Sequence, residues 1–84
     1  MNYRITVKPS AEKELEKIEN KDRKRILEAL WHLSADPFLG KKLAGEYHGY
    51  YSLRVWPYRI IYTVLRKKLL VVVIKIGHRQ GVYS

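Results

Sequence analysis

The fold is decided by residues 50–77, which read YYSLRVWPYRIIYTVLRKKLLVVVIKIG. Three segments of this stretch are rich in β-branched and aromatic residues: Tyr50–Trp56, Tyr58–Leu65 and Leu69–Gly77. Pro57 separates the first two segments, and the basic run at residues 66–68 separates the last two. We therefore predict three consecutive strands joined by two turns.

The residues before this stretch predict one more strand and two helices. Residues 2–8 alternate apolar and polar side chains, as a half-buried strand requires, and Pro9 ends that strand. Ser10 is placed to cap a short first helix, and Asn20 to cap a second helix that Asp36-Pro37 ends. The apolar stripe of the second helix comprises Ile26, Leu27, Leu30, Trp31 and Leu33.

This β-αα-βββ order predicts an α+β fold in a single domain over residues 1–84, because so short a chain has no room for a second domain. The two helices are joined by only a few residues, so they form an antiparallel hairpin that needs a sheet to pack on. We expect an antiparallel sheet with this hairpin on one face and the other face partly open. The first strand is expected at the edge or the centre of the sheet, and residues 81–84 are expected to add a last short strand.

The charge of the chain is strongly positive and unevenly distributed. Seventeen Lys and Arg residues against eight Asp and Glu residues give a formal net charge of +9. Seven of the eight acidic residues precede residue 40, and the last is Glu46. This balance favours a nucleic-acid partner, although basic proteins also bind acidic proteins and membrane surfaces.

Several classes of site are disfavoured by composition. The chain has no cysteine, which excludes a disulfide framework and a thiolate metal site. Its histidines lack zinc-binding spacing, and its C-terminal half lacks the paired carboxylates of a two-metal nuclease. The longest aliphatic run, residues 69–74, is too short to span a bilayer, and the N-terminus lacks a signal peptide. We expect a soluble cytoplasmic protein that uses no metal and no cofactor and has no membrane partner.

The alternation of the first strand in the 50–77 stretch sorts its side chains into two sets. One face carries Tyr51, Leu53 and Val55, which we expect in the core. The other carries Tyr50, Ser52, Arg54 and Trp56. This second mixture of cation, hydroxyl and aromatic ring suits a surface that holds phosphate and stacks bases. It equally suits an amphipathic strand that shows its polar side to water.

Further candidate residues lie in the next strand and at the C-terminus. Arg59 stands in an otherwise apolar segment, and the scarcity of acidic residues nearby disfavours a salt bridge as its role. Arg79 is able to place a bidentate guanidinium on a phosphate, and Tyr83 is able to stack a base or exchange a proton. His78 is the only histidine beside them, and both a catalytic role and no role at all stay open for it.

Four segments of the chain resemble the RelE branch of the RelE/ParE toxin superfamily. They are residues 42–45 (KLAG), 51–62 (YSLRVWPYRIIY), 73–79 (VIKIGHR) and 82–83 (VY). The opening strand, the helical pair and the Asp36-Pro37 stop also look like that family, so the resemblance extends over essentially the whole chain.

The resemblance implies a toxin of a type II toxin–antitoxin pair that enters the ribosomal A site and cleaves the bound mRNA codon. Cleavage in this family is metal-free, and the ribose 2′-hydroxyl attacks the adjacent phosphate. By motif, Arg59 and Arg79 correspond to the arginines that bind phosphate and stabilise the transition state. Tyr83 corresponds to the tyrosine that orients the substrate. The implied partners are a RelB-like antitoxin, the ribosome and mRNA.

The chain departs from the best-studied members, which carry two lysines where Tyr50 and Ser52 stand here. Neither residue is a base at neutral pH, so the general base is left open between Tyr50 and His78. The candidate charge donors to RNA are Lys41, Lys42 and Arg54. Two other functions stay open: a ParE-like inhibitor of DNA gyrase without nuclease activity, and a binding-only protein that occupies an antitoxin.

Overall fold

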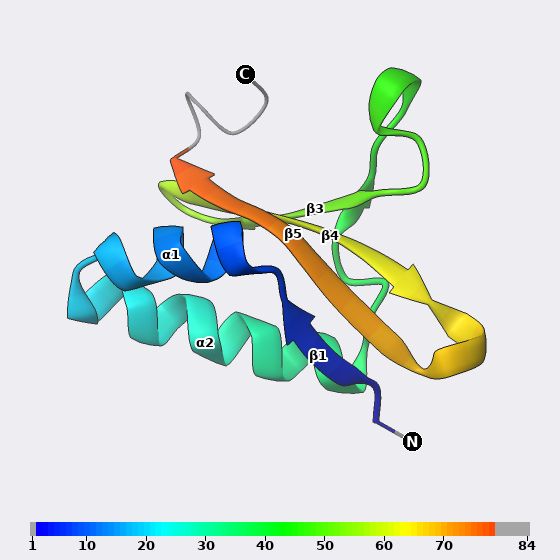
Figure 1. The fold of residues 1–84 in the computed structure, drawn as a ribbon, viewed down its shortest axis with the longest axis horizontal. Helices are drawn as coiled ribbons and strands as arrows, with labels where there is room; N and C mark the ends of the chain where they lie inside the picture. Colours follow the sequence, from blue (N-terminus) through cyan, green and yellow to red (C-terminus); the bar gives the residue numbers. More distant parts are fainter. Residues whose placement is uncertain (1, 79–84) are drawn as a thin grey trace.

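The computed structural model describes residues 2–78 as two helices packed on one face of a sheet (Figure 1). The helices are α1 (Pro9–Lys17) and α2 (Asn20–Ala35). The strands are β1 (Arg4–Val7), β2 (Lys41–Lys42), β3 (Tyr51–Val55), β4 (Tyr58–Leu65) and β5 (Leu70–His78). The predicted α+β fold with a helical hairpin on one face is confirmed. The strand expected at residues 81–84 lies outside the described residues.

The sheet has the order β1-β5-β4-β3-β2, and it is mixed rather than wholly antiparallel. β1 pairs with β5 in parallel, with Ile5 opposite Val71, whereas all other neighbours are antiparallel. Alternation of apolar and polar residues is the same for both strand directions, so the pattern of β1 carries no signal for its orientation. β2, a two-residue strand inside the expected loop, was not predicted either.

The core lies between the helices and the sheet. The largest fully buried side chains are Ile26, Leu33, Ile60, Tyr62, Val71, Val73 and Ile76. Val55 belongs to the same cluster, and Tyr51 and Leu53 pack against it, which confirms the predicted inward face of β3. We call the face of the sheet that the helices do not cover the outer face.

The helices differ from the prediction in two respects. Leu27 and Trp31 were placed in the apolar stripe of α2, but they are 49% and 72% exposed. Ile26, Leu30 and Leu33 are the buried residues of α2, and the residue that follows each of them in the helix lies about a quarter-turn away from this row. The predicted caps are also wrong, because α1 begins at Pro9, where its missing N–H costs nothing, and Glu19 precedes α2.

Candidate nucleic-acid interface

Two arginines stand directly opposite each other on the outer face. Arg54 of β3 pairs with Arg59 of β4, and Arg59 in turn lies opposite Gly77 of β5. Their neighbours Leu53 and Ile60 face the helices, so alternation directs both arginine side chains outward. Side chains opposed in this way have Cβ atoms about 4.5–5.5 Å apart. The arrangement therefore concentrates two positive charges at one place on the sheet.

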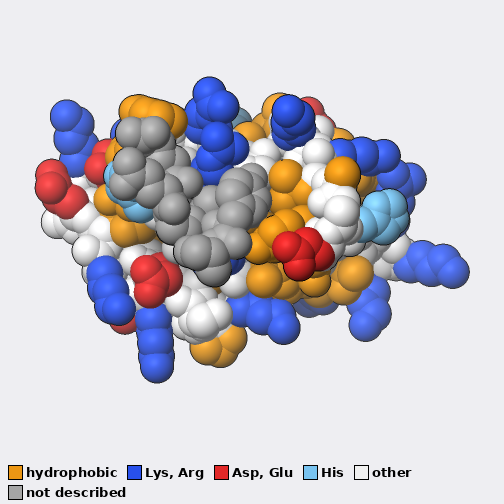
Figure 2. All heavy atoms as spheres, turned by 90° about the horizontal axis from the view of Figure 1, so that it is seen from above, with side chains coloured by type: hydrophobic (Ala, Val, Ile, Leu, Met, Phe, Trp, Pro, Cys, Tyr) orange, Lys and Arg blue, Asp and Glu red, His pale blue; other side chains and the backbone are white. Residues whose placement is uncertain are grey.

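Neither arginine side chain forms a hydrogen bond or an ion pair within residues 2–78. The two ion pairs of that region, Lys17–Glu14 and Arg25–Asp22, both belong to the helices. Like charges directly opposite on a sheet are destabilising. Seen from above, the molecule carries many more Lys and Arg side chains than Asp and Glu side chains (Figure 2). An anion bound between the arginines would relieve their repulsion.

A groove of about 340 Å³ adjoins the two arginines. We call it the arginine groove, and its lining residues are Leu39, Gly40, Lys41, Ser52, Leu53, Arg54 and Arg59. Ser52 is buried, and its hydroxyl has no hydrogen-bond partner in the described part of the chain. A buried hydroxyl left without a partner costs about 1–3 kcal/mol.

The segment that carries Lys41 is fixed to the sheet by Tyr62. The backbone N–H of Gly40 donates a hydrogen bond to the Tyr62 hydroxyl at 2.8 Å, and Lys41 then pairs with Ser52. A Cβ atom on residue 40 would lie 2.6 Å from the Tyr62 hydroxyl oxygen and 2.9 Å from the Ser52 carbonyl oxygen. Only glycine fits this approach, and it brings Lys41 to the same groove as Arg54 and Arg59.

Burial raises the pKa of the Tyr62 hydroxyl, and the hydrogen bond from Gly40 opposes this shift in part. The folded state therefore keeps the proton at a pH where the unfolded chain, with a tyrosine pKa of about 10, has begun to lose it. Unfolding at such a pH therefore releases the Tyr62 proton. The stability that comes from the raised pKa of Tyr62 is fully present below pH 10 and is lost as the pH rises through the folded pKa.

Tyr62→Phe has no hydroxyl to titrate at this position, so we expect its free energy of unfolding to fall less as the pH rises above 10. Urea unfolding at neutral pH and at a series of pH values above 10 would measure it. The wild-type free energy of unfolding should fall more steeply over the alkaline range than that of Tyr62→Phe. Parallel slopes for the two proteins would contradict the assignment of the shift to Tyr62.

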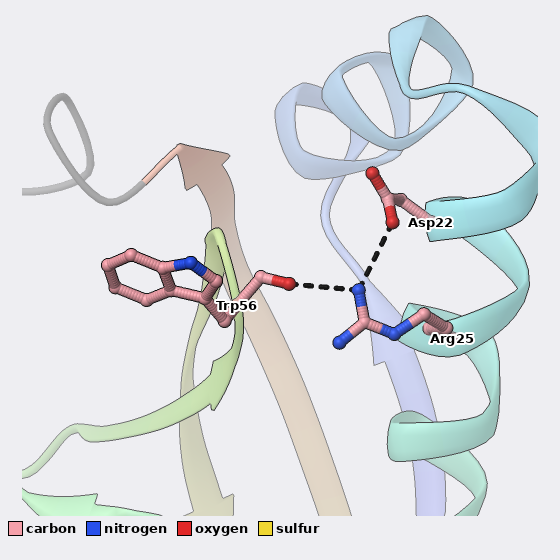
Figure 3. A network of polar contacts seen from close by, with 3 residues as sticks. All are labelled: Asp22, Arg25 and Trp56. Atoms are coloured by element: carbon pink, nitrogen blue, oxygen red, sulfur yellow. Dashed lines mark hydrogen bonds and ion pairs between the residues drawn. The ribbon is translucent and has the colours of Figure 1, made fainter.

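A contact between α2 and the sheet positions the turn between the two arginines. Arg25 Nη1 donates to the backbone carbonyl of Trp56 at 2.9 Å and to Asp22 Oδ1 at 3.1 Å (Figure 3). Trp56 follows β3 directly and precedes β4 by two residues. Arg25 thus ties α2 to the connection that aligns Arg54 with Arg59. The sequence contained no signal for this contact, because 31 positions separate its two residues.

The remaining candidate residues are distributed over three places. Lys42 and Tyr50 line a separate pocket beside the arginine groove. His78 of β5 lies opposite Tyr58 of β4, and Tyr58 lies opposite Val55 of β3. Because Val55 belongs to the core cluster, His78 is on the helix-side face and not on the face of Arg59. Its ring meets the Tyr58 ring edge-to-face at 5.9 Å between centroids. Arg79 and Tyr83 lie outside the described residues.

Three lining residues of the arginine groove were not predicted as site residues: Leu39, Gly40 and Leu53. Of these, only Gly40 carried a signal, as one of the glycines in a loop. Within residues 2–78 no three His, Asp or Glu side chains gather in a way that could hold a metal ion. In the same residues, neither helix has the length and apolar character needed to cross a membrane.

The fold is that of the RelE-type toxins of type II toxin–antitoxin systems. Over residues 5–83 the chain matches the family described as ParE toxin of type II toxin-antitoxin system, parDE. The chain belongs to this family, within the RelE/ParE superfamily.

Individual relatives agree with this assignment. Toxin RelG of Mycobacterium tuberculosis is 29% identical, and the match covers 99% of this chain and 98% of RelG. A chain of the toxin–antitoxin complex RelBE2 from the same organism superposes with a TM-score of 0.88 at 27% identity, covering 94% of this chain and 100% of that one. For the isolated Escherichia coli RelE toxin the TM-score is 0.80 at 26% identity, with coverages of 90% and 83%.

Proposed function

We propose that this toxin is a metal-free endoribonuclease that cleaves mRNA in the ribosomal A site and so inhibits translation. The observation that supports it most directly is the opposition of Arg54 and Arg59 without an acidic partner in residues 2–78. Such a pair is electrostatically unfavourable in the free protein and suits a phosphate that lies between two guanidinium groups. The similarity to RelE toxins agrees with this reaction.

In the proposed reaction the ribose 2′-oxygen attacks the adjacent phosphorus. The bond from phosphorus to the 5′-oxygen breaks, the 2′-proton passes to a base, and the 5′-oxygen leaves as a hydroxyl after protonation. The products are a 2′,3′-cyclic phosphate and a free 5′-hydroxyl. The pentacoordinate transition state gathers negative charge, which preorganised guanidinium groups stabilise without a metal.

The residues take separate roles in this scheme. Arg59 stabilises the charge on the phosphate, and Arg54 and Lys41 hold the strand in the groove. Arg79, which follows His78 in the chain, is proposed as the second arginine at the reacting phosphate, and Tyr83 as the residue that orients the substrate. The general base is left open between Tyr50 and His78, because Tyr50 lines the neighbouring pocket and β5 directs His78 to the helix-side face.

Mapping of mRNA ends on stalled ribosomes tests the proposal. Purified toxin added to programmed ribosomes should produce new ends within the A-site codon, and the upstream fragment should carry a cyclic phosphate. The same message without ribosomes serves as the control and should be cut poorly. Intact message at saturating toxin would rule out the nuclease.

A second candidate function is inhibition of DNA gyrase, which the family description as a ParE toxin favours. A supercoiling assay with purified gyrase separates the two functions, since a ParE-like toxin would block supercoiling and leave ribosome-bound message intact. A protein that does neither and fails to arrest growth would be a binding-only member.

We also propose a RelB-like antitoxin as the partner, with an acidic or amphipathic segment that covers the cationic outer face. Several similar structures are complexes of a toxin with its antitoxin, including RelE–RelB from Pyrococcus horikoshii, at a TM-score of 0.83 and 27% identity. Co-expression with a RelB-like antitoxin encoded beside this gene, if one is found there, should yield a complex that survives purification. Failure to co-purify at moderate salt would contradict the pairing.

A further inference from the structure

A second pocket, of about 230 Å³, adjoins the arginine groove across the short strand β2. We call it the aromatic pocket, and its lining residues are Phe38, Lys42, Leu43, His48, Gly49, Tyr50, Tyr51, Val64 and Arg66. Lys41 pairs with Ser52 on the outer face, whereas Lys42 pairs with Tyr51 on the other face. The two lysines are consecutive, so β2 carries one cation toward each site.

The wall of the aromatic pocket is anchored in the core. Phe38 meets Tyr51 edge-to-face at 5.7 Å between ring centroids. Tyr51 in turn stacks on Tyr62 at 5.4 Å, and Tyr62 is fully buried. This row of three rings leads from the core to the surface, where Phe38 is 40% exposed. A ligand would therefore meet a wall that is already held in place before binding.

The charges around the aromatic pocket favour an anionic ligand. Lys42, Arg66 and His48 line it, and none of its lining residues is acidic. The Arg66 guanidinium lies over the Phe38 ring, with its carbon 4.8 Å from the ring centroid. Aromatic rings beside guanidinium and ammonium groups form the surface on which proteins stack nucleobases and hold the attached phosphate.

We propose that the aromatic pocket binds one nucleotide of a single-stranded RNA that continues over β2 from the arginine groove. The pocket is smaller than the 300–1,000 Å³ range that is typical of drug-sized ligands, so it suits one ring system. The inference deepens the proposed function and rests on it, because it takes the bound strand to be RNA.

Binding and crosslinking of RNA to the isolated protein test this site without any need for cleavage. A short single-stranded RNA that contains 4-thiouridine is bound at low salt, irradiated, and the crosslinked peptide is identified by mass spectrometry. We expect crosslinks at Phe38, His48 or Tyr50. Phe38→Ala and Arg66→Glu should each weaken binding about tenfold, as expected for the loss of one stacked base with its phosphate contact.

The control is Lys67→Glu, which makes the same charge change next to Arg66 but does not line the aromatic pocket. It should weaken binding much less than Arg66→Glu. Equal losses for the two variants, or crosslinks confined to α1 and α2, would overturn the inference. Unchanged RNA binding by Phe38→Ala and Arg66→Glu, with loss of antitoxin binding in both, would instead make the pocket a protein-docking site and also overturn it.

Two further arms identify the source of the nucleotide and separate this inference from the nuclease proposal. On programmed ribosomes, a message that contains 4-thiouridine reports crosslinks to mRNA. The same irradiation with an unlabelled message reports crosslinks to ribosomal RNA. Crosslinks in the aromatic pocket in either arm support the site. Crosslinks in the pocket without A-site cleavage would leave this inference standing and refute the nuclease. A-site cleavage without crosslinks in the pocket, in either arm, would overturn this inference and leave the nuclease proposal standing.

Discussion

Replacing Arg59 with alanine should lower the rate of A-site cleavage by about 10²–10³-fold, the usual cost of one lost donor at a developing oxyanion. Arg59 is half-buried and lies opposite Arg54, so its interaction with a phosphate is less screened by water than at a fully exposed position. Single-turnover cleavage of ribosome-bound message, measured at saturating toxin, reports the change without a contribution from binding. Arg79→Ala should likewise abolish toxicity.

The stability of Arg59→Ala separates a catalytic role from a structural one. Because Arg59 opposes Arg54, the variant should unfold at the same urea concentration as the wild type or at a higher one. Arg4→Ala removes an exposed arginine of β1 at the opposite edge of the sheet and should cleave at the wild-type rate. Comparable losses in Arg4→Ala and Arg59→Ala would mean that overall charge, and not the groove, determines activity.

Replacing Tyr62 with alanine should lower the free energy of unfolding by about 3–5 kcal/mol, the range for truncation of a large buried ring. Tyr62 is the largest fully buried side chain, it stacks on Tyr51, and its hydroxyl accepts the hydrogen bond from Gly40. Small domains have only about 5–15 kcal/mol of stability in total. Tyr62→Ala should therefore be close to unfolding at room temperature, as measured by urea denaturation.

Two variants calibrate this result. Tyr62→Phe keeps the ring and loses one hydrogen bond, so we expect a cost of about 1 kcal/mol. Trp31→Ala removes a side chain of comparable size that is 72% exposed, and its effect should stay within about 0.5 kcal/mol. If Tyr62→Ala proved no more destabilising than Trp31→Ala, Tyr62 would not be the anchor of the segment that carries Lys41.

Local sequence patterns were enough to predict both helices and four of the five described strands, in the right order. Alternation in residues 51–55 and the turn at Pro57 predicted β3 and β4, and the apolar run that follows predicted β5 to within one residue at each end. The sequence also located Arg54 and Arg59, because cations in apolar strands are visible as exceptions to a periodic pattern. These features are local, so a short window contains all of the information that they require.

How these elements meet was not predictable from local patterns. Three features depend on residues that are distant in sequence: the parallel pairing of β1 with β5, the exposure of Trp31, and the contact from Arg25 to Trp56. The same holds for the opposition of Arg54 and Arg59, which follows from the register across the turn and not from either residue alone. Alternation assigns a side chain to a face, but only the pairing of strands decides which side chain stands beside it. The arginine groove is a product of that pairing.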